Sequence, residues 1–268
     1  SPPMQYTRLG RTGLQVSRIC LGCMTFGVPE RGAHPWTLDE AASRPLLRQA
    51  VELGINFFDT ADMYSLGVSE ELTGKLLREF GVKRENVVVA TKVYFNLTDE
   101  INGGGLSRKH IMNAIDASLT RLGMDYVDLY QIHRFDPRVP VEETMEALDT
   151  LVKQGKVRYV ACSNFSAWHI MKCLMASERH NLQRFVCQQI HYTVEAREAE
   201  YELIPLGLDQ GIGVQVWSPI AGGLLSGKFR RNAPPPDISR HLMAWNEPPI
   251  RDENRLYNII DTLVLDVR

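Results

Sequence analysis

The sequence predicts an α/β fold, a (β/α)8 TIM barrel, whose eighth β/α unit is absent from these 268 residues. Short, almost continuously apolar runs alternate with longer amphipathic segments, and the pattern repeats about every 30 residues, the size of one βα unit. Apolarity over a whole short run is typical of parallel strands buried on both faces. Seven such runs along one chain favour a barrel over a doubly wound sheet.

The apolar runs are the predicted barrel strands. No Gly-x-Gly-x-x-Gly follows the first two of them, as a dinucleotide-binding doubly wound sheet would require. Ahead of the first predicted strand, the segment of about residues 5–16 carries Gly10 and Gly13 between short apolar stretches. This pattern predicts a hairpin that plugs the bottom of the barrel. The predicted strands are Ser17–Gly22, Ile55–Phe58, Val87–Thr91, Val127–Ile132, Val157–Cys162, Val186–Ile190 and Val214–Trp217.

The segments between the strands have helical periodicity and the expected end signals. A serine hydroxyl satisfies free N–H groups at a helix start, and a glycine adopts the left-handed conformation that ends a helix. Met171, Leu174 and Met175 are expected on the inner face of another helix. The predicted helices begin after Ser43 and end at Gly54, begin after Ser107 and end at Gly123, and span Val141–Gln154 and Arg197–Gln210.

Residues 1–268 are expected to form one barrel domain whose C-terminal closure is missing. After Trp217 the chain continues as a loop rich in Gly and Pro and then as a last helix. An open barrel exposes two strand edges, which proteins avoid. Two explanations stay open: the closing unit lies outside this sequence, or another chain completes the barrel. The last helix carries Leu256, Ile259, Ile260, Leu263, Val264 and Val267 at helical spacing.

Composition excludes several classes of partner. The 30 Lys and Arg against 32 Asp and Glu give a net charge of −2, so nucleic acid and anionic membranes are not expected partners. No stretch approaches the ~20 apolar residues that cross a bilayer. The start, Ser1-Pro2-Pro3-Met4, lacks the regions of a signal peptide.

The cysteines predict a reducing compartment, the cytoplasm. They number five, an odd count that does not suit a disulfide framework. Cys20-x-x-Cys23 has the spacing of redox and zinc sites, but no second Cys or His pair stands at ligand spacing. Because Cys20 falls within an apolar run, a buried thiol is expected, and no metal site is predicted.

Ionisable side chains end three successive predicted strands. Asp59 follows Phe57-Phe58, Lys92 follows Ala90-Thr91, and His133 follows Gln131-Ile132. Active sites of barrels lie at the carboxyl ends of the strands, and neighbouring strands are ~4.8 Å apart, so these groups should converge. Tyr64 lies on the loop that leaves the Asp59 strand and can reach the same place.

This set suits proton delivery to a carbonyl that accepts a hydride. Tyrosine, with a pKa of about 10, is a weak acid near neutrality, and a neighbouring ammonium lowers that pKa. Lys92 is the predicted ammonium, with Asp59 as its counterion, and His133 would orient the carbonyl oxygen. Each group alone is explained by structure, as an ion pair or a loop histidine; four compatible groups on consecutive strands favour a catalytic site.

The string Asp59-Thr60-Ala61-Asp62-Met63-Tyr64, with Lys92 and His133 in their motifs, resembles the aldo-keto reductase family. The resemblance runs from Leu9 to about Phe229. Leu21–Gly27 is similar to a bacterial branch related to the potassium-channel β-subunits. The resemblance implies a (β/α)8 barrel that reduces carbonyl compounds with NAD(P)H, Tyr64 as general acid, Lys92 and Asp59 tuning it, and His133 positioning the substrate.

The same resemblance implies a cofactor site. Ser163, Asn164 and Gln189 would bind the nicotinamide carboxamide, Trp217 would stack on its ring, and Ser218–Lys228 would surround the pyrophosphate. NADP(H) is expected from the family, with NAD(H) left open, because the segment that binds the 2′-phosphate is not in this sequence. The implied cofactor-binding residues are Gly22, Met24, Asp59, Ser163, Asn164, Gln189, Trp217, Ser218, Pro219, Ile220, Gly222, Leu224 and Lys228.

The leading hypothesis is an NAD(P)H-dependent aldo-keto reductase that acts on a small-molecule carbonyl substrate. The identity of the substrate and the oligomeric state of the protein stay open. A second is a nucleotide-binding, redox-sensing regulatory module with negligible turnover. A third is a barrel lyase with Lys92 as Schiff-base nucleophile. Pairing with Asp59 argues against the third, because a paired ammonium is harder to deprotonate.

Overall fold

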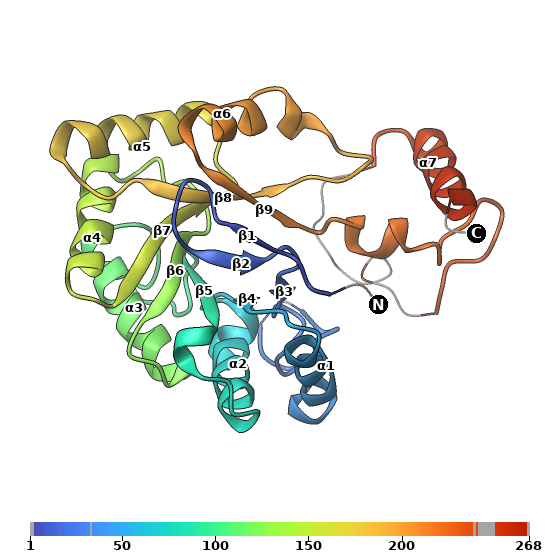
Figure 1. Ribbon diagram of the computed structural model, residues 1–268, viewed down its shortest axis with the longest axis horizontal. Helices are drawn as coiled ribbons and strands as arrows, with labels where there is room; N and C mark the ends of the chain where they lie inside the picture. The colour runs from blue at the N-terminus through green and yellow to red at the C-terminus, as the bar shows by residue number, and fades with distance from the viewer. Residues whose placement is uncertain (1–2, 33, 238–239, 241–249, 267–268) are drawn as a thin grey trace.

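The structure, a computed structural model, describes residues 3–32, 34–237, 240 and 250–266 (Figure 1). Seven strands form one sheet in the order β3-β4-β5-β6-β7-β8-β9, each parallel to the next. The predicted barrel architecture is therefore confirmed. The strands are β3 Leu21–Gly22, β4 Phe57–Asp59, β5 Val88–Val93, β6 Val127–Ile132, β7 Val157–Ser163, β8 Phe185–His191 and β9 Gly213–Trp217.

Helices α1 to α6 surround the sheet, and α7 lies apart from them, beside η4 (Figure 1). Ser107 and Gly123 cap α3 as predicted: the Ser107 side chain accepts from the N–H of His110, and Gly123 is left-handed. The α-helices are α1 Glu40–Glu52, α2 Val68–Glu79, α3 Arg108–Leu122, α4 Val141–Lys153, α5 Ala167–His180, α6 Leu203–Gln210 and α7 Glu253–Asp266, and the 3-10 helices are η1 Tyr64–Gly67, η2 Arg84–Asn86, η3 Glu198–Glu200 and η4 Ala221–Ser226.

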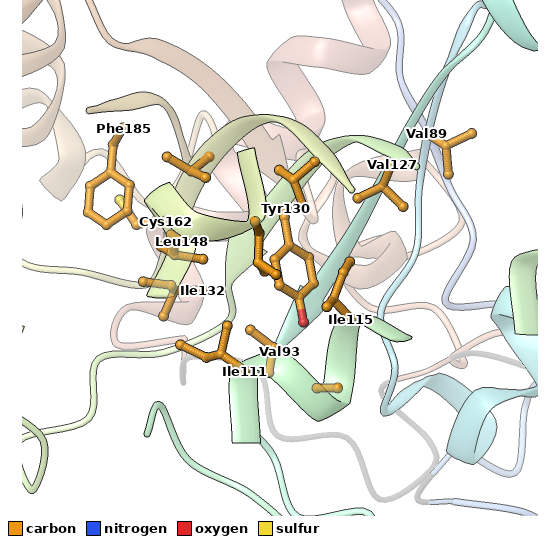
Figure 2. Close-up of a cluster of buried hydrophobic side chains, with 14 of the residues drawn as sticks. Val89, Val93, Ile111, Ile115, Val127, Tyr130, Ile132, Leu148, Cys162 and Phe185 are labelled. Carbon is orange, nitrogen blue, oxygen red and sulfur yellow. The ribbon is translucent and has the colours of Figure 1, made fainter. Parts of the chain in front are cut away.

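The main core lies between the strands and the surrounding helices. Figure 2 shows part of it, where Val93 and Tyr130 of the sheet meet Ile111 and Ile115 of α3. All four side chains are buried, and Tyr130 is 0% exposed. Burial of a side chain of this size contributes ~1.5–3 kcal/mol, so this layer fixes the strands that carry the site.

A hairpin of β1 Tyr6–Arg8 and β2 Gln15–Ser17 covers the amino ends of the strands. Its Leu9 and Val16 pack in one cluster with side chains from inside the barrel, Phe57 and Leu129 among them. Gly10 comes so close to the start of β9 that a Cβ would lie 2.6 Å from the carbonyl oxygen of Gly211. Because the hairpin covers the amino ends of the strands, ligands have access to the barrel at the carboxyl ends of the strands.

Two predicted element starts are wrong. The run Ser17–Gly22 is not one strand, because the Ser17 hydroxyl donates to the carbonyl of Ile19 at 2.6 Å and turns the chain between β2 and β3. Ile19 is 59% exposed there. Helix α1 starts at Glu40, not after Ser43, because the Asp39 carboxylate caps the N–H of Ala42.

The predicted helix over 197–210 is two pieces, η3 and α6. Proline lacks the N–H that a helix interior needs, and the first turn of a helix tolerates it best; Pro205 lies in the first turn of α6, which starts at Leu203. Helix α2 was not predicted at all. In α5, Leu174 is buried as expected, but Met171 is 41% and Met175 55% exposed, so their placement on the inner face is wrong.

The sheet ends at β3 and β9, which are not paired with each other among the described strands. Beyond β9, η4 and α7 pack together through Ala221, Leu224, Phe229, Leu256 and Ile260. Val267, predicted on this last helix, lies outside the described residues. Within the described part of the chain, every helix is too short or too polar to cross a membrane.

Candidate active site

Asp59, Lys92 and Tyr64 form one buried hydrogen-bonded group. Asp59 is the last residue of β4, Lys92 lies in β5, and Tyr64 begins η1 after a short loop that leaves β4. Lys92 Nζ donates to Asp59 Oδ2 at 2.6 Å, to the Thr60 carbonyl at 2.9 Å and to the Tyr64 hydroxyl at 3.1 Å. Lys92 is 0% exposed, so all three of its protons are used inside the protein.

Local backbone geometry brings Tyr64 to this place. Ser65 and Leu66 have φ values of 48° and 47°, a left-handed conformation that side chains rarely adopt. Gly27 lies against Ser65, and a Cβ at residue 27 would collide with that side chain. Strained backbone of this kind persists only where the surroundings enforce it, and it is common at functional sites.

The pKa of Tyr64 is raised overall: the lowering effect expected of Lys92 is present, but burial outweighs it. Burial raises the pKa, and the attraction and hydrogen bond of the Lys92 ammonium oppose that effect without overcoming it, while the charge of Asp59 adds to it. The sequence predicted that the Lys92 ammonium lies beside Tyr64, but it did not predict how deeply the Tyr64 hydroxyl is buried. Tyr64 is therefore protonated at neutral pH and has a proton to give.

Lys92 is held as an ammonium. Burial disfavours its charge, but the charges and hydrogen bonds of Asp59 and Tyr64 together outweigh burial and raise the pKa of Lys92. A Schiff base requires a free amine, and the three hydrogen bonds that Lys92 Nζ donates favour the ammonium instead. The lyase hypothesis therefore has no support in this geometry.

His133 completes the group from the next strand. Its ring lies edge-on to Tyr64, with 5.9 Å between centroids. Burial, followed by the charges of Lys92 and Arg134, lowers the pKa of His133 well below its ordinary value, so the imidazole is neutral at physiological pH. Its Nδ1 is buried and has no hydrogen-bond partner within the described residues, whereas His133 lines the pocket below, so Nε2 is the nitrogen available to a ligand.

A pocket of about 450 Å³ opens beside these side chains at the carboxyl ends of the strands. Lys92 lies behind Tyr64 rather than in the pocket wall. Predicted site residues that line the pocket are Gly22, Met24, Asp59, Tyr64, His133, Ser163, Asn164, Gln189, Trp217, Ser218 and Pro219. Predicted residues outside its wall are Ile220, Gly222, Leu224 and Lys228, which continue along η4 and beyond.

The β7 and β9 ends of the pocket are joined by hydrogen bonds. Asn164 Nδ2 donates to the His133 carbonyl at 3.1 Å and to Ser163 Oγ at 3.2 Å. The Trp217 indole N–H donates to Asn164 Oδ1 at 3.1 Å. The Trp217 ring also lies beside His191, with 4.5 Å between centroids. These contacts fix the indole as a flat wall of the pocket.

The loop after β9 is a series of tight turns. Ser218, Ala221, Gly222 and Gly223 all have left-handed φ values, between 48° and 104°. Within this loop the N–H of Ala221 donates to the Ser218 carbonyl at 2.9 Å and the N–H of Gly223 to the Ile220 carbonyl at 3.1 Å, so these groups close turns of the loop itself. Lys228 follows and is exposed, while Leu224 is buried against α7.

Several pocket residues were missed by sequence reasoning. Met63, Phe95 and Arg134 line the wall near His133, and Phe95 lies edge-on to it at 4.9 Å. Arg240 lines the wall from the C-terminal part of the chain and donates to Thr25 Oγ1 at 2.9 Å. The loop residues carry no pattern that points to a site.

Gln131 is the missed residue whose position could have been noticed. It is 0% exposed inside β6, where its Nε2 donates to Asp59 Oδ1 at 2.7 Å. Its Oε1 accepts from Gln189 Nε2 at 3.2 Å. An amide between Tyr130 and Ile132, two residues before His133, is the signal that sequence reasoning passed over.

The two cysteines of Cys20-x-x-Cys23 differ in position. Cys23 is buried as expected, and burial raises its pKa to about 12. Cys20 is not inside a strand but between β2 and β3; it is half-buried and lines the pocket, where Gln215 Nε2 donates to its Sγ at 3.4 Å. The expected place of Cys20 inside a strand is wrong, and its thiol is only partly buried. Its pKa is also raised, first by burial, so it stays a thiol.

Asp62, behind the site, makes stability depend on pH. Both its oxygens are buried and have no hydrogen-bond partner among the described residues. Burial, then the charge of Glu70, raises its pKa well above the ordinary value. The folded state therefore binds this proton more tightly than the unfolded state, and stability falls as pH rises from about 4 toward the raised pKa.

We expect Asp62→Asn to remove this dependence. As pH rises through that window, the free energy of unfolding of the variant minus that of the unsubstituted protein should increase by at most about 1.4 kcal/mol for each pH unit. Urea denaturation at a series of pH values measures the difference. A constant difference between the two proteins across the series would contradict the assignment.

Comparison with known proteins agrees with this geometry. The model of the Aldo/keto reductase family matches residues 18–260. Versiconal hemiacetal acetate reductase of Aspergillus parasiticus is 42% identical, over 83% of this chain and 69% of its own length. The uncharacterized oxidoreductase YrpG of Bacillus subtilis is 43% identical, over 84% and 69%.

A probable voltage-gated potassium channel subunit beta of Arabidopsis thaliana is 39% identical, over 87% of this chain and 69% of that protein. The matches thus include a fungal, a bacterial and a plant protein and do not single out the bacterial branch. The family match covers the strands that carry Asp59, Lys92 and His133 and the loop that carries Tyr64. On this evidence the chain belongs to the aldo/keto reductase family.

Proposed function

We propose that this protein reduces aldehydes or ketones to alcohols with NADPH, or with NADH, and that Tyr64 is the general acid. The observation that carries the proposal is the 3.1 Å hydrogen bond between the buried Lys92 ammonium and the Tyr64 hydroxyl, at the wall of an open pocket. The family and its oxidoreductase members support carbonyl reduction in general.

The residues present fit a nicotinamide dinucleotide. Trp217 offers a fixed flat surface at one end of the pocket, and Gln189 offers an amide next to it. The glycine-containing loop Ser218–Lys228 follows Trp217 and would lie along the pyrophosphate. When bound, this cofactor supplies the hydride. Lys228 adds an exposed positive charge near the same loop.

The proton comes from the protein. Tyr64 is protonated at neutral pH and can donate its hydroxyl proton to a carbonyl oxygen that gains negative charge. Lys92 then stabilises the phenolate that remains, because its ammonium already touches the Tyr64 oxygen. Asp59 keeps the ammonium in place and balances its charge in the barrel.

His133 orients the carbonyl. Because its imidazole is neutral, it can donate one N–H to the carbonyl oxygen without competing with Tyr64 as an acid. Asn164 holds the backbone of His133 through the hydrogen bond to its carbonyl oxygen. The carbonyl oxygen would thus lie between two donors, Tyr64 and His133, within the same pocket.

The proposal predicts steady-state turnover with a panel of aldehydes such as nitrobenzaldehyde and methylglyoxal. NADPH and NADH, each at several concentrations, should be consumed with formation of one alcohol per cofactor oxidised. The decrease in absorbance of the reduced cofactor measures the rate. Binding of the cofactor without turnover of any aldehyde or ketone would defeat the reductase proposal.

That last outcome would favour a second function, a nucleotide-binding regulatory module. The similarity to a probable potassium channel subunit beta is the observation behind it. Nucleotide that stays bound through purification, together with no carbonyl turnover, distinguishes it from the reductase. For either function we infer a reducing compartment, the cytoplasm, because all five cysteines are free.

A further inference from the structure

A chain of side-chain amides crosses the inside of the barrel from Asp59 to the pocket. Gln131 of β6 donates from Nε2 to Asp59 Oδ1 at 2.7 Å. Gln189 of β8 donates from Nε2 to Gln131 Oε1 at 3.2 Å. Gln131 is 0% and Gln189 4% exposed, so water does not replace these bonds. One end of the chain is the Lys92–Asp59 pair, and the other end lines the pocket.

The Asp59 carboxylate determines the orientation of the Gln131 and Gln189 side-chain amides. The Asp59 carboxylate, paired with Lys92, only accepts hydrogen bonds, so Gln131 must turn its NH2 group toward it. The carbonyl oxygen of Gln131 then faces Gln189, which must in turn present its own NH2 group. Gln189 Oε1 is left facing the pocket, and no hydrogen bond to this atom occurs within the described residues.

Other polar groups at this end of the pocket are already engaged. Ser163 Oγ donates to the Gln189 backbone carbonyl at 3.0 Å and accepts from Asn164 Nδ2. Asn164 Oδ1 accepts from the Trp217 indole. Gln189 Oε1 is therefore a fixed acceptor whose direction is set from inside the barrel, by Asp59 through Gln131.

We propose that Gln131 is a positioning residue: it locks the amide of Gln189 so that the pocket presents a hydrogen-bond acceptor and selects a ligand with an N–H donor. The inference rests on the proposed function, in which the group facing Gln189 is the nicotinamide carboxamide that the family resemblance already implies; what it adds is that Gln131 sets the direction of this amide. A ring that carries a carboxylate instead would set two acceptors against each other. Unpaired or repelling buried acceptors are costly, so the carboxamide should bind at least about tenfold more tightly.

The test compares the binding of NADP⁺ with that of its nicotinic acid analogue, which differs only in that carboxylate. Quenching of the intrinsic tryptophan fluorescence gives a Kd for each nucleotide, and the ratio of the two is the readout. A general loss of affinity through poorer folding would change both constants and leave the ratio unchanged. Thermal melting of each variant checks that the folded protein is measured.

Two substitutions at Gln131 have opposite expected results. Gln131→Met keeps the size but removes both hydrogen bonds, so Gln189 is free to turn its NH2 group to the pocket. The carboxamide preference should then fall to about threefold or less. Gln131→Glu, which shares a proton with Asp59, still offers an acceptor to Gln189, so the preference should be kept.

Gln188→Met is the matched control. Gln188 is the neighbour of Gln189 on β8, and its Nε2 donates to the Leu203 carbonyl at 2.7 Å, away from the amide chain. Its nucleotide preference should equal that of the unsubstituted protein. An unchanged preference in Gln131→Met, or a lost preference in Gln131→Glu, would overturn the inference while leaving the reductase proposal standing. Failure of the unsubstituted protein to bind either nucleotide would instead refute the proposed function, and this inference with it.

Discussion

Tyr64→Phe is expected to lower kcat for carbonyl reduction by about 10²–10⁴-fold, the contribution of a positioned acid. The substitution removes only the hydroxyl that accepts from Lys92 Nζ at 3.1 Å and leaves the ring in its buried place. Without that hydroxyl, no other described side chain in the pocket wall offers a proton held beside a buried ammonium. KM for the aldehyde should change much less than kcat, because His133 is still present to orient the carbonyl.

Tyr130→Phe provides a matched control for the same chemical change. Tyr130 is also fully buried, but it faces the helix layer, and its hydroxyl has no hydrogen-bond partner among the described residues. Removing this hydroxyl should leave kcat unchanged and the melting temperature equal or higher. Steady-state kinetics on both variants decide the matter: an active Tyr64→Phe, or an equal loss in Tyr130→Phe, would show that Tyr64 is not the acid.

The sequence predicted the location of the site because the rule behind it is topological. In a parallel barrel all strands end at the same rim, so Asp59, Lys92 and His133 had to meet once the strands were recognised. The structure brings Lys92 to 2.6 Å from Asp59, on neighbouring strands. Tyr64 could be added because only a short loop separates it from the end of β4.

The amide chain could not be predicted in the same way. Gln131 and Gln189 lie on β6 and β8, which are not neighbours, and whether they touch depends on strand tilt and on side-chain direction inside the barrel. The direction of the Tyr64 pKa likewise depends on burial, which residue types alone do not give. The predicted starts of a strand and of α1 were wrong because side chains bond to the nearby backbone there. The Ser17 hydroxyl donates to the Ile19 carbonyl, and the Asp39 carboxylate accepts from the N–H of Ala42.

Lys92→Met is expected to lower the free energy of unfolding by about 3–5 kcal/mol, the usual cost of leaving one member of a buried ion pair alone. Lys92 is 0% exposed and Asp59 only 7%, so the Asp59 carboxylate would be left without its counterion in a largely buried place. Asp59 keeps its hydrogen bond from Gln131, but one amide does not balance a buried charge. Urea denaturation, with the slope checked for unchanged two-state unfolding, measures the loss.

Combining Lys92→Met with Asp59→Asn separates charge from packing. If the unpaired carboxylate causes the loss, the double variant should recover most of it, because both charges are gone and the volumes are nearly kept. If instead the methylene groups of Lys92 matter only through packing, the losses in free energy of unfolding caused by Lys92→Met and by Asp59→Asn will add. Turnover should remain low in the double variant, since no ammonium is left beside Tyr64. A stable but inactive double variant is therefore the expected result: it would show that the unpaired Asp59 carboxylate causes the loss of stability and that turnover requires the Lys92–Asp59 pair.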